Sequence, residues 1–178
     1  FFQAEDGIRD SVASRGRGDV YKRQTWDHTL TLFRGKLILA GGLRNYKGVF
    51  EGTLSPDKTD VTWKPLPSMN RDRWYHLSVK VNNDFLMVMG GHYEKTTEYF
   101  NGTGWEMGPS LPFALYDASA VTDRNGRVII TGGYNDPSHG GNAKSSKIIV
   151  FDLEKKAFEV VEGYGLREPR SNHISLLQ

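Results

Sequence analysis

Three histidines in this chain carry the side chain that most often ligates metals in proteins. His28, His76 and His173 stand at the same position of an internal repeat, and Asp117 takes that position in the remaining copy. Repeat units that pack side by side hold equivalent residues far apart, so these side chains are not expected to meet around one ion. We therefore interpret them as packing and hydrogen-bonding residues and predict neither a metal site nor a cofactor.

The chain lacks the motifs that common catalytic sites require. It has no Gly-x-Ser-x-Gly elbow, no phosphate-binding loop with Lys-Ser or Lys-Thr, no His-Glu-x-x-His and no EF-hand pattern. Zero cysteines exclude disulfides, thiolate metal sites and cysteine nucleophiles within this stretch. These observations predict that the chain is not an enzyme.

The composition describes a globular chain without a strongly charged surface. Hydrophobic residues make up 38% and aromatic residues 12% of the 178 positions, enough to build a core. The 23 basic and 21 acidic side chains are interspersed and leave a net charge of +2, so nucleic acid is not an expected partner. No apolar run approaches the roughly 18 residues that a membrane span needs. The compartment stays open between cytoplasmic and extracellular.

The first 24 residues differ from the rest because they show neither strand alternation nor a helical stripe. Their tract QAEDGIRD resembles the translation of a common sequencing-adapter oligonucleotide. We expect residues 1–24 to be a non-native or disordered leader and exclude them from the fold. The chain also starts without methionine and stops within a repeat at SLLQ, so we expect it to be a fragment.

Three apolar runs that each end in two glycines mark the repeat. They are LILAGG (37–42), FLMVMGG (85–91) and VIITGG (128–133). Before each run, a short alternating segment and a polar or glycine-rich turn predict a β-hairpin whose second strand is buried. After each run, two more strand candidates follow, separated by turn residues. Each copy is therefore predicted to be four short strands in a meander.

A single four-stranded sheet of this size cannot bury its own faces, so the copies must pack against one another. The radial arrangement of such sheets is a β-propeller. In it we expect the second strand to lie near the axis, with neighbours on both faces, and the chain to turn sharply where it leaves. Glycine suits that turn because it allows positive φ and a close backbone approach.

The repeated residues resemble the kelch motif. The shared features are the double glycine, an aromatic residue on the third strand, another on the fourth, and an arginine-containing segment that leads into the next copy. The glycines and aromatics are Gly41, Gly42, Gly90, Gly91, Gly132, Gly133, Trp63, Tyr99, Trp105, Phe151 and Phe158. The third copy departs from the pattern: it lacks the tryptophan, its lead-in LPFALYDAS has no arginine, and Asp117 replaces the histidine.

The resemblance implies an all-β, kelch-type β-propeller, here partial, with about three four-stranded antiparallel blades plus the first strand of a fourth. The expected blades cover residues 25–69, 70–112 and 113–166, and residues 167–178 begin the next. The aromatic pairs Tyr99/Trp105 and Phe151/Phe158 are expected on adjacent outer strands of one blade, where they seal it against its neighbour.

A kelch-type propeller implies a protein–protein interaction module, or adaptor, that binds a protein or peptide partner through its inter-strand loops. Kelch-like propellers place the loops after the double glycines on the same face as the segments leading into the next blade. The candidate partner-binding residues are then Arg44, Tyr46, Asn70, Arg71, Arg73, His92, Tyr93, Tyr134, His139 and Arg170. Two roles are open for the arginines at 71, 73 and 170: they pair with neighbouring carboxylates, or they read an acidic peptide.

Two alternative functions remain open. One is a galactose-oxidase-like copper oxidase. Such an enzyme needs a cysteine, which this chain lacks, so its catalytic residues would lie in missing blades. The other is a secreted glycan-binding ectodomain. Asn101-Gly102-Thr103 fits an N-glycosylation sequon and equally an Asn-Gly hairpin turn, so Asn101 is a possible glycosylation site if the protein is secreted.

Overall fold

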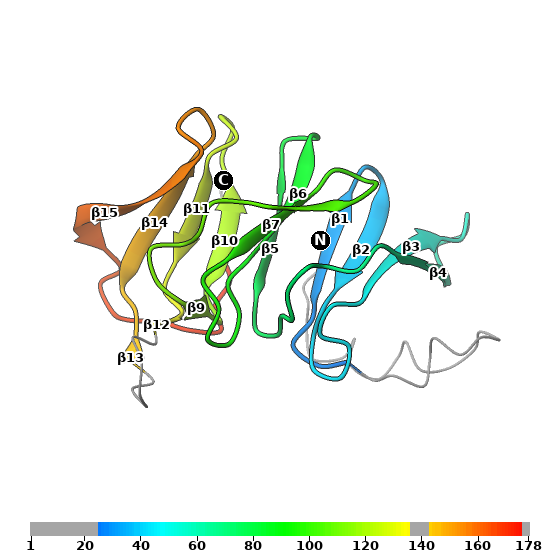
Figure 1. The fold of residues 1–178 in the computed structure, drawn as a ribbon, viewed down its shortest axis with the longest axis horizontal. Helices are drawn as coiled ribbons and strands as arrows, with labels where there is room; N and C mark the ends of the chain where they lie inside the picture. The colour runs from blue at the N-terminus through cyan, green and yellow to red at the C-terminus, as the bar shows by residue number, and fades with distance from the viewer. Residues whose placement is uncertain (1–24, 136–142, 176–178) are drawn as a thin grey trace.

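The structure is a computed structural model that describes residues 25–135 and 143–175. The expected leader, residues 1–24, and the candidate residue His139 lie outside the described residues. In the described part, the named strands form three four-stranded antiparallel sheets and one small three-stranded sheet (Figure 1). The all-β class and the four-stranded antiparallel blades expected from the sequence are confirmed.

Each large sheet, called a blade here, is a meander of antiparallel neighbours. Blade 1 contains β1 (Thr29–Phe33), β2 (Lys36–Ala40), β3 (Val49–Leu54) and β4 (Val61–Leu66). Blade 2 contains β5 (Leu77–Val81), β6 (Phe85–Met89), β7 (Thr97–Phe100) and β8 (Trp105–Met107). Blade 3 contains β10 (Ser119–Thr122), β11 (Val128–Thr131), β14 (Lys147–Asp152) and β15 (Ala157–Gly165). The small sheet is made of β13 (Ala143–Lys144), β12 (Tyr134–Asn135) and β9 (Leu115–Tyr116), in that order.

The hydrophobic core lies between the blades. In β6, Leu86 and Val88 belong to the cluster shared with blade 1, and Met87 and Met89 belong to the cluster shared with blade 3. All four side chains are 0% exposed. Because side chains alternate along a strand, β6 is covered on both faces, which explains why its sequence is continuously apolar.

The first strands of neighbouring blades come closest to one another. β1 contacts β5, and β5 contacts β10. Thr31 Oγ1 and Ser78 Oγ lie 2.8 Å apart across the first contact, and Thr122 Oγ1 donates to the Lys80 carbonyl at 2.6 Å across the second. The expectation that the second strand lies nearest the axis is therefore wrong. The second strand lies in the middle of its blade, between the first and third strands. In blade 2 a neighbouring blade also packs on each face of this strand.

The first glycine of each pair sits where one blade passes closest to the next. Gly41, Gly90 and Gly132 have φ of 65°, 63° and 65°, so their backbones are equivalent. A Cβ at each of these positions would meet a carbonyl oxygen in the segment that leads into the following blade. A side chain would therefore be strained by the backbone angle and would also push the blades apart.

Tyr99 and Trp105 lie on the adjacent outer strands β7 and β8, as expected, but they do not face the same neighbouring blade. Trp105 lies opposite Phe100, with ring centroids 5.0 Å apart, whereas the Tyr99 ring is 6.5 Å from Phe151 of blade 3. Adjacent residues of a strand point to opposite faces, so Tyr99 packs toward blade 3 while Phe100 and Trp105 pack toward blade 1. Phe151 and Phe158 do pair as expected, opposite each other at 4.7 Å.

Residues 171–175 form no strand, although the first strand of a fourth blade was expected there. They still lie against blade 3, because the Ser175 N–H donates to Ser119 Oγ at 2.8 Å. A first strand is held by backbone pairing with its second strand, and the described residues contain none after Gly165. The small sheet was not expected either, since strands of two residues give no periodic pattern.

Candidate functional site

Backbone hydrogen bonds hold the loop after each double glycine against the segment that leads into the next blade. The second glycine donates its N–H to a carbonyl of that segment: Gly42 to Arg73 at 2.8 Å, Gly91 to Leu115 at 2.9 Å, and Gly133 to Arg170 at 2.7 Å. These segments therefore lie together at one end of the blades, the lower edge of Figure 1, where β9, β12 and β13 are labelled. We call this end the loop face.

A second series of backbone hydrogen bonds runs from blade to blade along the loop face. The Tyr75 N–H donates to the Asp27 carbonyl at 3.1 Å, the Asp117 N–H to the Tyr75 carbonyl at 3.1 Å, and the Asn172 N–H to the Asp117 carbonyl at 2.9 Å. All four residues have positive φ, between 51° and 57°. They form an arc at the start of the first strands, and the arc holds Asp27, Tyr75 and Asp117 close together.

Aromatic side chains of all three blades form a continuous band on the loop face. Ring centroids are 5.2 Å apart for Tyr46 and Trp74, 5.3 Å for Trp74 and His92, and 5.6 Å for His92 and Tyr116. Tyr134 stacks on Tyr116 at 5.1 Å. We define the aromatic band as Tyr46, Trp74, His92, Tyr93, Tyr116 and Tyr134. Its members alternate between post-glycine loops and lead-in segments, so neighbouring blades build it together.

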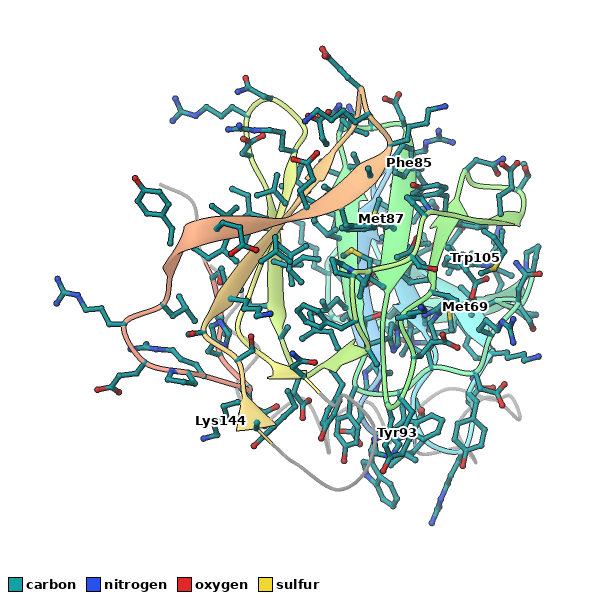
Figure 2. All side chains as sticks on the ribbon, turned by 60° about the vertical axis from the view of Figure 1, so that its left-hand side comes forward. Met69, Phe85, Met87, Tyr93, Trp105 and Lys144 are labelled. Atoms are coloured by element: carbon teal, nitrogen blue, oxygen red, sulfur yellow. The ribbon has the colours of Figure 1, made fainter. Side chains whose placement is uncertain are left out.

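The band combines buried and exposed rings. Tyr116 is 8% exposed, whereas Tyr46 is 41% and Tyr93 is 70% exposed. Figure 2 places Tyr93 at the bottom of the molecule, at the end opposite Phe85. An aromatic ring that packs on neighbouring rings and is exposed to solvent on its other side loses little conformational freedom when a partner covers it. Such rings are therefore effective contact residues.

The arc carries two carboxylates, Asp27 and Asp117, which we call the acidic pair. Burial, followed by the negative charge of Asp27, raises the pKa of Asp117 to about 6. Burial, the charge of Asp27 and a hydrogen bond to Asp27 raise the pKa of Tyr75, and the charge of Asp117 adds to this rise. Within residues 25–135 and 143–175, neither carboxylate forms an ion pair with a lysine or arginine. The Tyr75 ring lies 6.3 Å from Tyr116, so the acidic pair adjoins the aromatic band.

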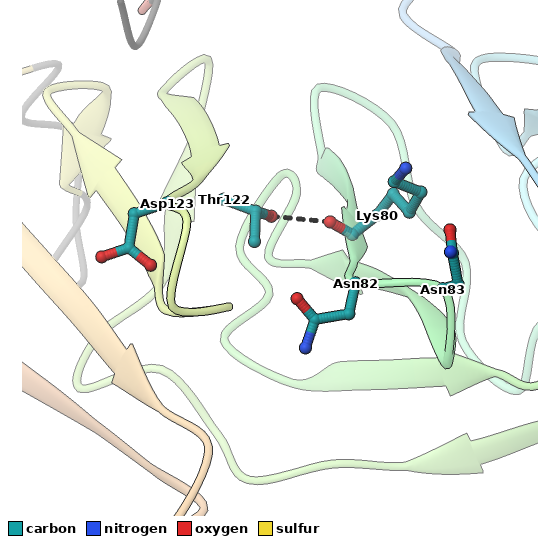
Figure 3. A pocket seen from close by; sticks show the side chains of 5 residues that line it. All are labelled: Lys80, Asn82, Asn83, Thr122 and Asp123. Atoms are coloured by element: carbon teal, nitrogen blue, oxygen red, sulfur yellow. Dashed lines mark hydrogen bonds between the residues drawn. The ribbon is translucent and has the colours of Figure 1, made fainter.

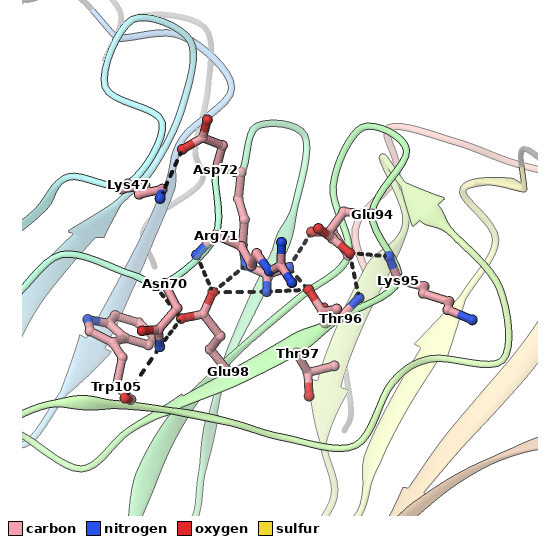
Figure 4. Close-up of polar contacts among 12 residues, drawn as sticks. Lys47, Asn70, Arg71, Asp72, Glu94, Lys95, Thr96, Thr97, Glu98 and Trp105 are labelled. Atoms are coloured by element: carbon pink, nitrogen blue, oxygen red, sulfur yellow. Dashed lines mark hydrogen bonds and ion pairs between the residues drawn. The ribbon is translucent and has the colours of Figure 1, made fainter.

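Arg73, a candidate partner-binding residue, is 0% exposed and serves the fold instead. Its Nη2 lies 3.0 Å from Oε1 of Glu98, which is also 0% exposed. The guanidinium also donates to the carbonyls of Gly90 and Thr96, each at 2.8 Å. Figure 4 shows Glu98 and Thr96, two of its partners, together with the contacts from Asn70 to Glu98. Burial lowers the pKa of Arg73, and Glu98 opposes that shift. The expectation that Arg73 contacts a partner is corrected: of its two open roles, it has the carboxylate pairing.

The remaining candidates have diverse positions. Arg44 places its guanidinium 4.7 Å from the Trp26 ring centroid. Asn70, Arg71 and Arg170 are exposed on the loop face, and Asn70 donates from its backbone and side chain to Glu98. Sequence reasoning missed Asp27, Trp74, Tyr75 and Tyr116, which carry much of the site. Asn101 is exposed in the β7–β8 turn, where its Oδ1 accepts the Thr103 N–H at 2.9 Å.

A polar hollow lies away from the loop face, between blades 2 and 3. It has a volume of about 370 Å³ and is lined by Lys80, Asn82, Asn83, Thr122 and Asp123 (Figure 3). The described residues contain no group of three or more His, Cys, Asp or Glu side chains placed to hold a metal ion. They also contain no helix long and apolar enough to cross a membrane.

Three four-stranded blades that pack through their faces, with equivalent glycines at their junctions, define an all-β repeat protein of β-propeller architecture. A kelch domain-containing protein of Saccharolobus solfataricus is 40% identical to the chain over 62 residues, a match that covers 34% of this chain and 8% of that protein. No protein-family model matches the chain. The resemblance to kelch-repeat proteins inferred from the sequence is confirmed by this match.

Proposed function

We propose that the chain is an interaction module that binds a protein or peptide partner through the loop face. The observation that carries this proposal is the aromatic band, which runs across three blades and leaves Tyr46 and Tyr93 open to solvent. Tyrosine and tryptophan are the residue types most enriched among those that dominate binding energy at protein interfaces. The kelch likeness adds support, since kelch repeats are generally interaction modules.

The proposal assigns no reaction to the chain. The copper-oxidase and glycan-binding alternatives gain no support from the comparison, because the matching relative is described only by its kelch domain. Because Arg73 is buried in an ion pair with Glu98, it is not available to bind an acidic partner. The arginines among the candidate partner-binding residues that remain exposed are Arg44, Arg71 and Arg170.

A peptide array tests this proposal against many partner sequences at once. The labelled full chain is applied to immobilised peptides of random sequence, and the positive peptides are remade for solution titration. Replacing both Tyr46 and Tyr93 by alanine should weaken binding roughly 30-fold or more, the effect of losing interface anchor residues.

The matched control is Tyr164→Ala, because Tyr164 is 77% exposed but lies on β15, outside the band. It should leave peptide binding unchanged. Peptides that bind the Tyr46→Ala/Tyr93→Ala variant as tightly as the parent chain, or an array with no positive peptide, would refute the proposal.

A further inference from the structure

We propose that the β7–β8 turn poises Asn101 for a self-modification, in which the Gly102 backbone nitrogen attacks the Asn101 side chain and converts it into aspartate or isoaspartate. Water is the one co-reactant that the reaction needs. This inference is independent of partner binding. It follows from the hydrogen bonds of the turn and from a comparison with the other Asn-Gly pair of the chain, Asn125-Gly126.

The reaction joins a backbone nitrogen to the side-chain carbonyl carbon of the preceding asparagine. The Gly102 nitrogen forms a bond to Asn101 Cγ and loses its proton to Nδ2, which leaves as ammonia when its bond to Cγ breaks. Water then opens the resulting succinimide ring at either of its two carbonyl carbons. One opening gives aspartate and the other gives isoaspartate. One water is consumed and one ammonia is released, with no oxidation or reduction.

The first argument is that the Gly102 nitrogen is open to react. Asn101, Gly102 and Thr103 are all exposed. Within residues 25–135 and 143–175, the Gly102 N–H donates no hydrogen bond. Glycine also has no Cβ that would hinder the approach of its nitrogen to the neighbouring side chain. The turn therefore leaves the attacking atom accessible and without a competing partner.

The second argument is the set of donors around Asn101 Oδ1. This oxygen accepts the Thr103 N–H at 2.9 Å, the Thr103 hydroxyl at 2.8 Å and the Gly104 N–H at 3.1 Å. Negative charge develops on Oδ1 when a nitrogen adds to Cγ, and donors at about 2.7–3.1 Å stabilise such an oxygen. The bond from the Thr103 N–H also closes a ring that contains both Cγ and the Gly102 nitrogen, so the side chain curls over the peptide that attacks it.

The third argument is that Asn125-Gly126 lacks these features. Gly126 is buried, and its N–H donates to the Asp123 carbonyl at 3.0 Å. The hydrogen bond printed by the Asn125 turn comes from the Asn125 backbone N–H, which donates to Asp123 Oδ1 at 2.9 Å, and not from its side chain. The Gly126 nitrogen would have to break its turn before it could attack. We therefore expect selective modification within one chain, at Asn101 and not at Asn125.

Modification of Asn101 would act on the junction between blades 1 and 2. Arg34, in the β1–β2 turn, donates from Nη1 to the Asn101 carbonyl at 2.8 Å and from Nη2 to the Asp84 carbonyl at 3.0 Å. Asp84 adjoins Phe85, which Figure 2 places at the end opposite the loop face. Isoaspartate lengthens the main chain of the turn and turns the carbonyl that Arg34 binds into a free carboxylate. The reaction would therefore add a negative charge at this contact.

Peptide mapping by mass spectrometry tests the inference on the full chain. The folded chain is incubated at neutral pH, sampled over time and digested, and each Asn-Gly pair is scored for conversion of the amide to a carboxyl group. Chromatography separates the aspartate from the isoaspartate peptides. Asn101 should convert roughly tenfold faster than Asn125 or more, as expected where donors stabilise the developing charge at one site only. In the chain unfolded by urea, the two pairs should convert at similar rates.

A threonine variant tests the contribution of the donors. Thr103→Val keeps the shape of the side chain but removes its hydroxyl, so it should slow conversion of Asn101 roughly threefold or more in the folded chain. Thr59→Val is the matched control, because Thr59 is exposed in the β3–β4 turn, where its hydroxyl donates to Asp57. It should leave the rate at Asn101 unchanged. Circular dichroism establishes that each variant keeps its strand content.

Three results would overturn the inference. The first is equal conversion of Asn101 and Asn125 in the folded chain. The second is a folded chain in which Asn101 stays intact while both pairs convert in urea. The third is a Thr103→Val variant that converts Asn101 as fast as the parent chain does. Faster conversion of Asn101 than of Asn125, lost in urea and slowed by Thr103→Val, would support it.

Discussion

Replacement of Arg73 by methionine should destabilise the protein severely, although Arg73 lies beside exposed residues in the sequence. Its guanidinium donates five hydrogen bonds: two to Glu98 Oε1, one each to the carbonyls of Gly90 and Thr96, and one to Thr96 Oγ1. Methionine fills a similar volume but donates none. Glu98 then keeps its buried negative charge with only donors around Asn70 and Arg71 to satisfy it.

The magnitude follows from the burial of both partners. Removing one member of a buried ion pair costs about 3–5 kcal/mol, because the other charge is left without compensation. Domains of this size have total unfolding free energies of roughly 5–15 kcal/mol, so this loss takes a large share of the stability. It corresponds to a decrease of about 10 °C in the melting temperature of a domain of 150 to 250 residues.

Urea denaturation of the full chain, followed by circular dichroism, measures this effect. Arg71→Met is the matched control, since Arg71 is the exposed neighbour and its replacement should change the free energy of unfolding by less than about 0.5 kcal/mol. Adding Glu98→Gln to Arg73→Met should recover about 1 kcal/mol or more, because it removes the stranded charge. A loss below about 1 kcal/mol for Arg73→Met, or no recovery in the double variant, would refute the assignment of Arg73 as a buried structural residue.

Two further predictions concern the junctions between blades. Gly90→Ala should cost roughly 2–4 kcal/mol of unfolding free energy in urea denaturation, because φ is 63° and the new Cβ meets the Leu115 carbonyl oxygen, whereas Gly104→Ala, with open space around it, should be nearly neutral. Burial lowers the pKa of His76 to about 3. Between about pH 6.5 and pH 3, the His76 imidazole is therefore protonated in the unfolded chain but neutral in the folded chain. Stability due to His76 is therefore present above pH 6.5 and should fall by up to about 1.4 kcal/mol per pH unit toward pH 3; a melting-temperature profile that His76→Gln leaves equally steep would contradict this.

Much of the fold could be predicted because the repeat consists of residue types with strong local preferences for strand or turn conformations. Apolar runs ending in Gly41, Gly90 and Gly132 predict a buried strand and a sharp exit, and the structure has both at each position. The choice of axial strand failed because burial on both faces does not distinguish a strand at the hub from one in the middle of a blade. That distinction depends on which strands of different blades meet, which is a long-range property.

The candidate site was predicted in part. The post-glycine loops could be located because they directly follow the repeated double glycines, so the prediction included Tyr46, His92 and Tyr93. Trp74 and Tyr116 were missed, although each directly precedes a residue of the arc and a recurring aromatic at that position was visible in the sequence. The burial of Arg73 could not be foreseen, because its carboxylate partner Glu98 sits on the third strand of the same blade, where the other blades have Phe50 and Ile149.

The hydrogen bond from each second glycine to the following lead-in segment has an evolutionary consequence. Each of these junctions on the loop face is composite, with one half supplied by a blade and the other half by its successor. Each blade contributes its lead-in segment to one junction and its post-glycine loop to the next. Exchanging or duplicating a single blade would therefore change two adjoining junctions and preserve the rest of the loop face. On the proposed binding surface, recognition would therefore diversify in small steps and would depend on the order of the blades as well as on their individual loops.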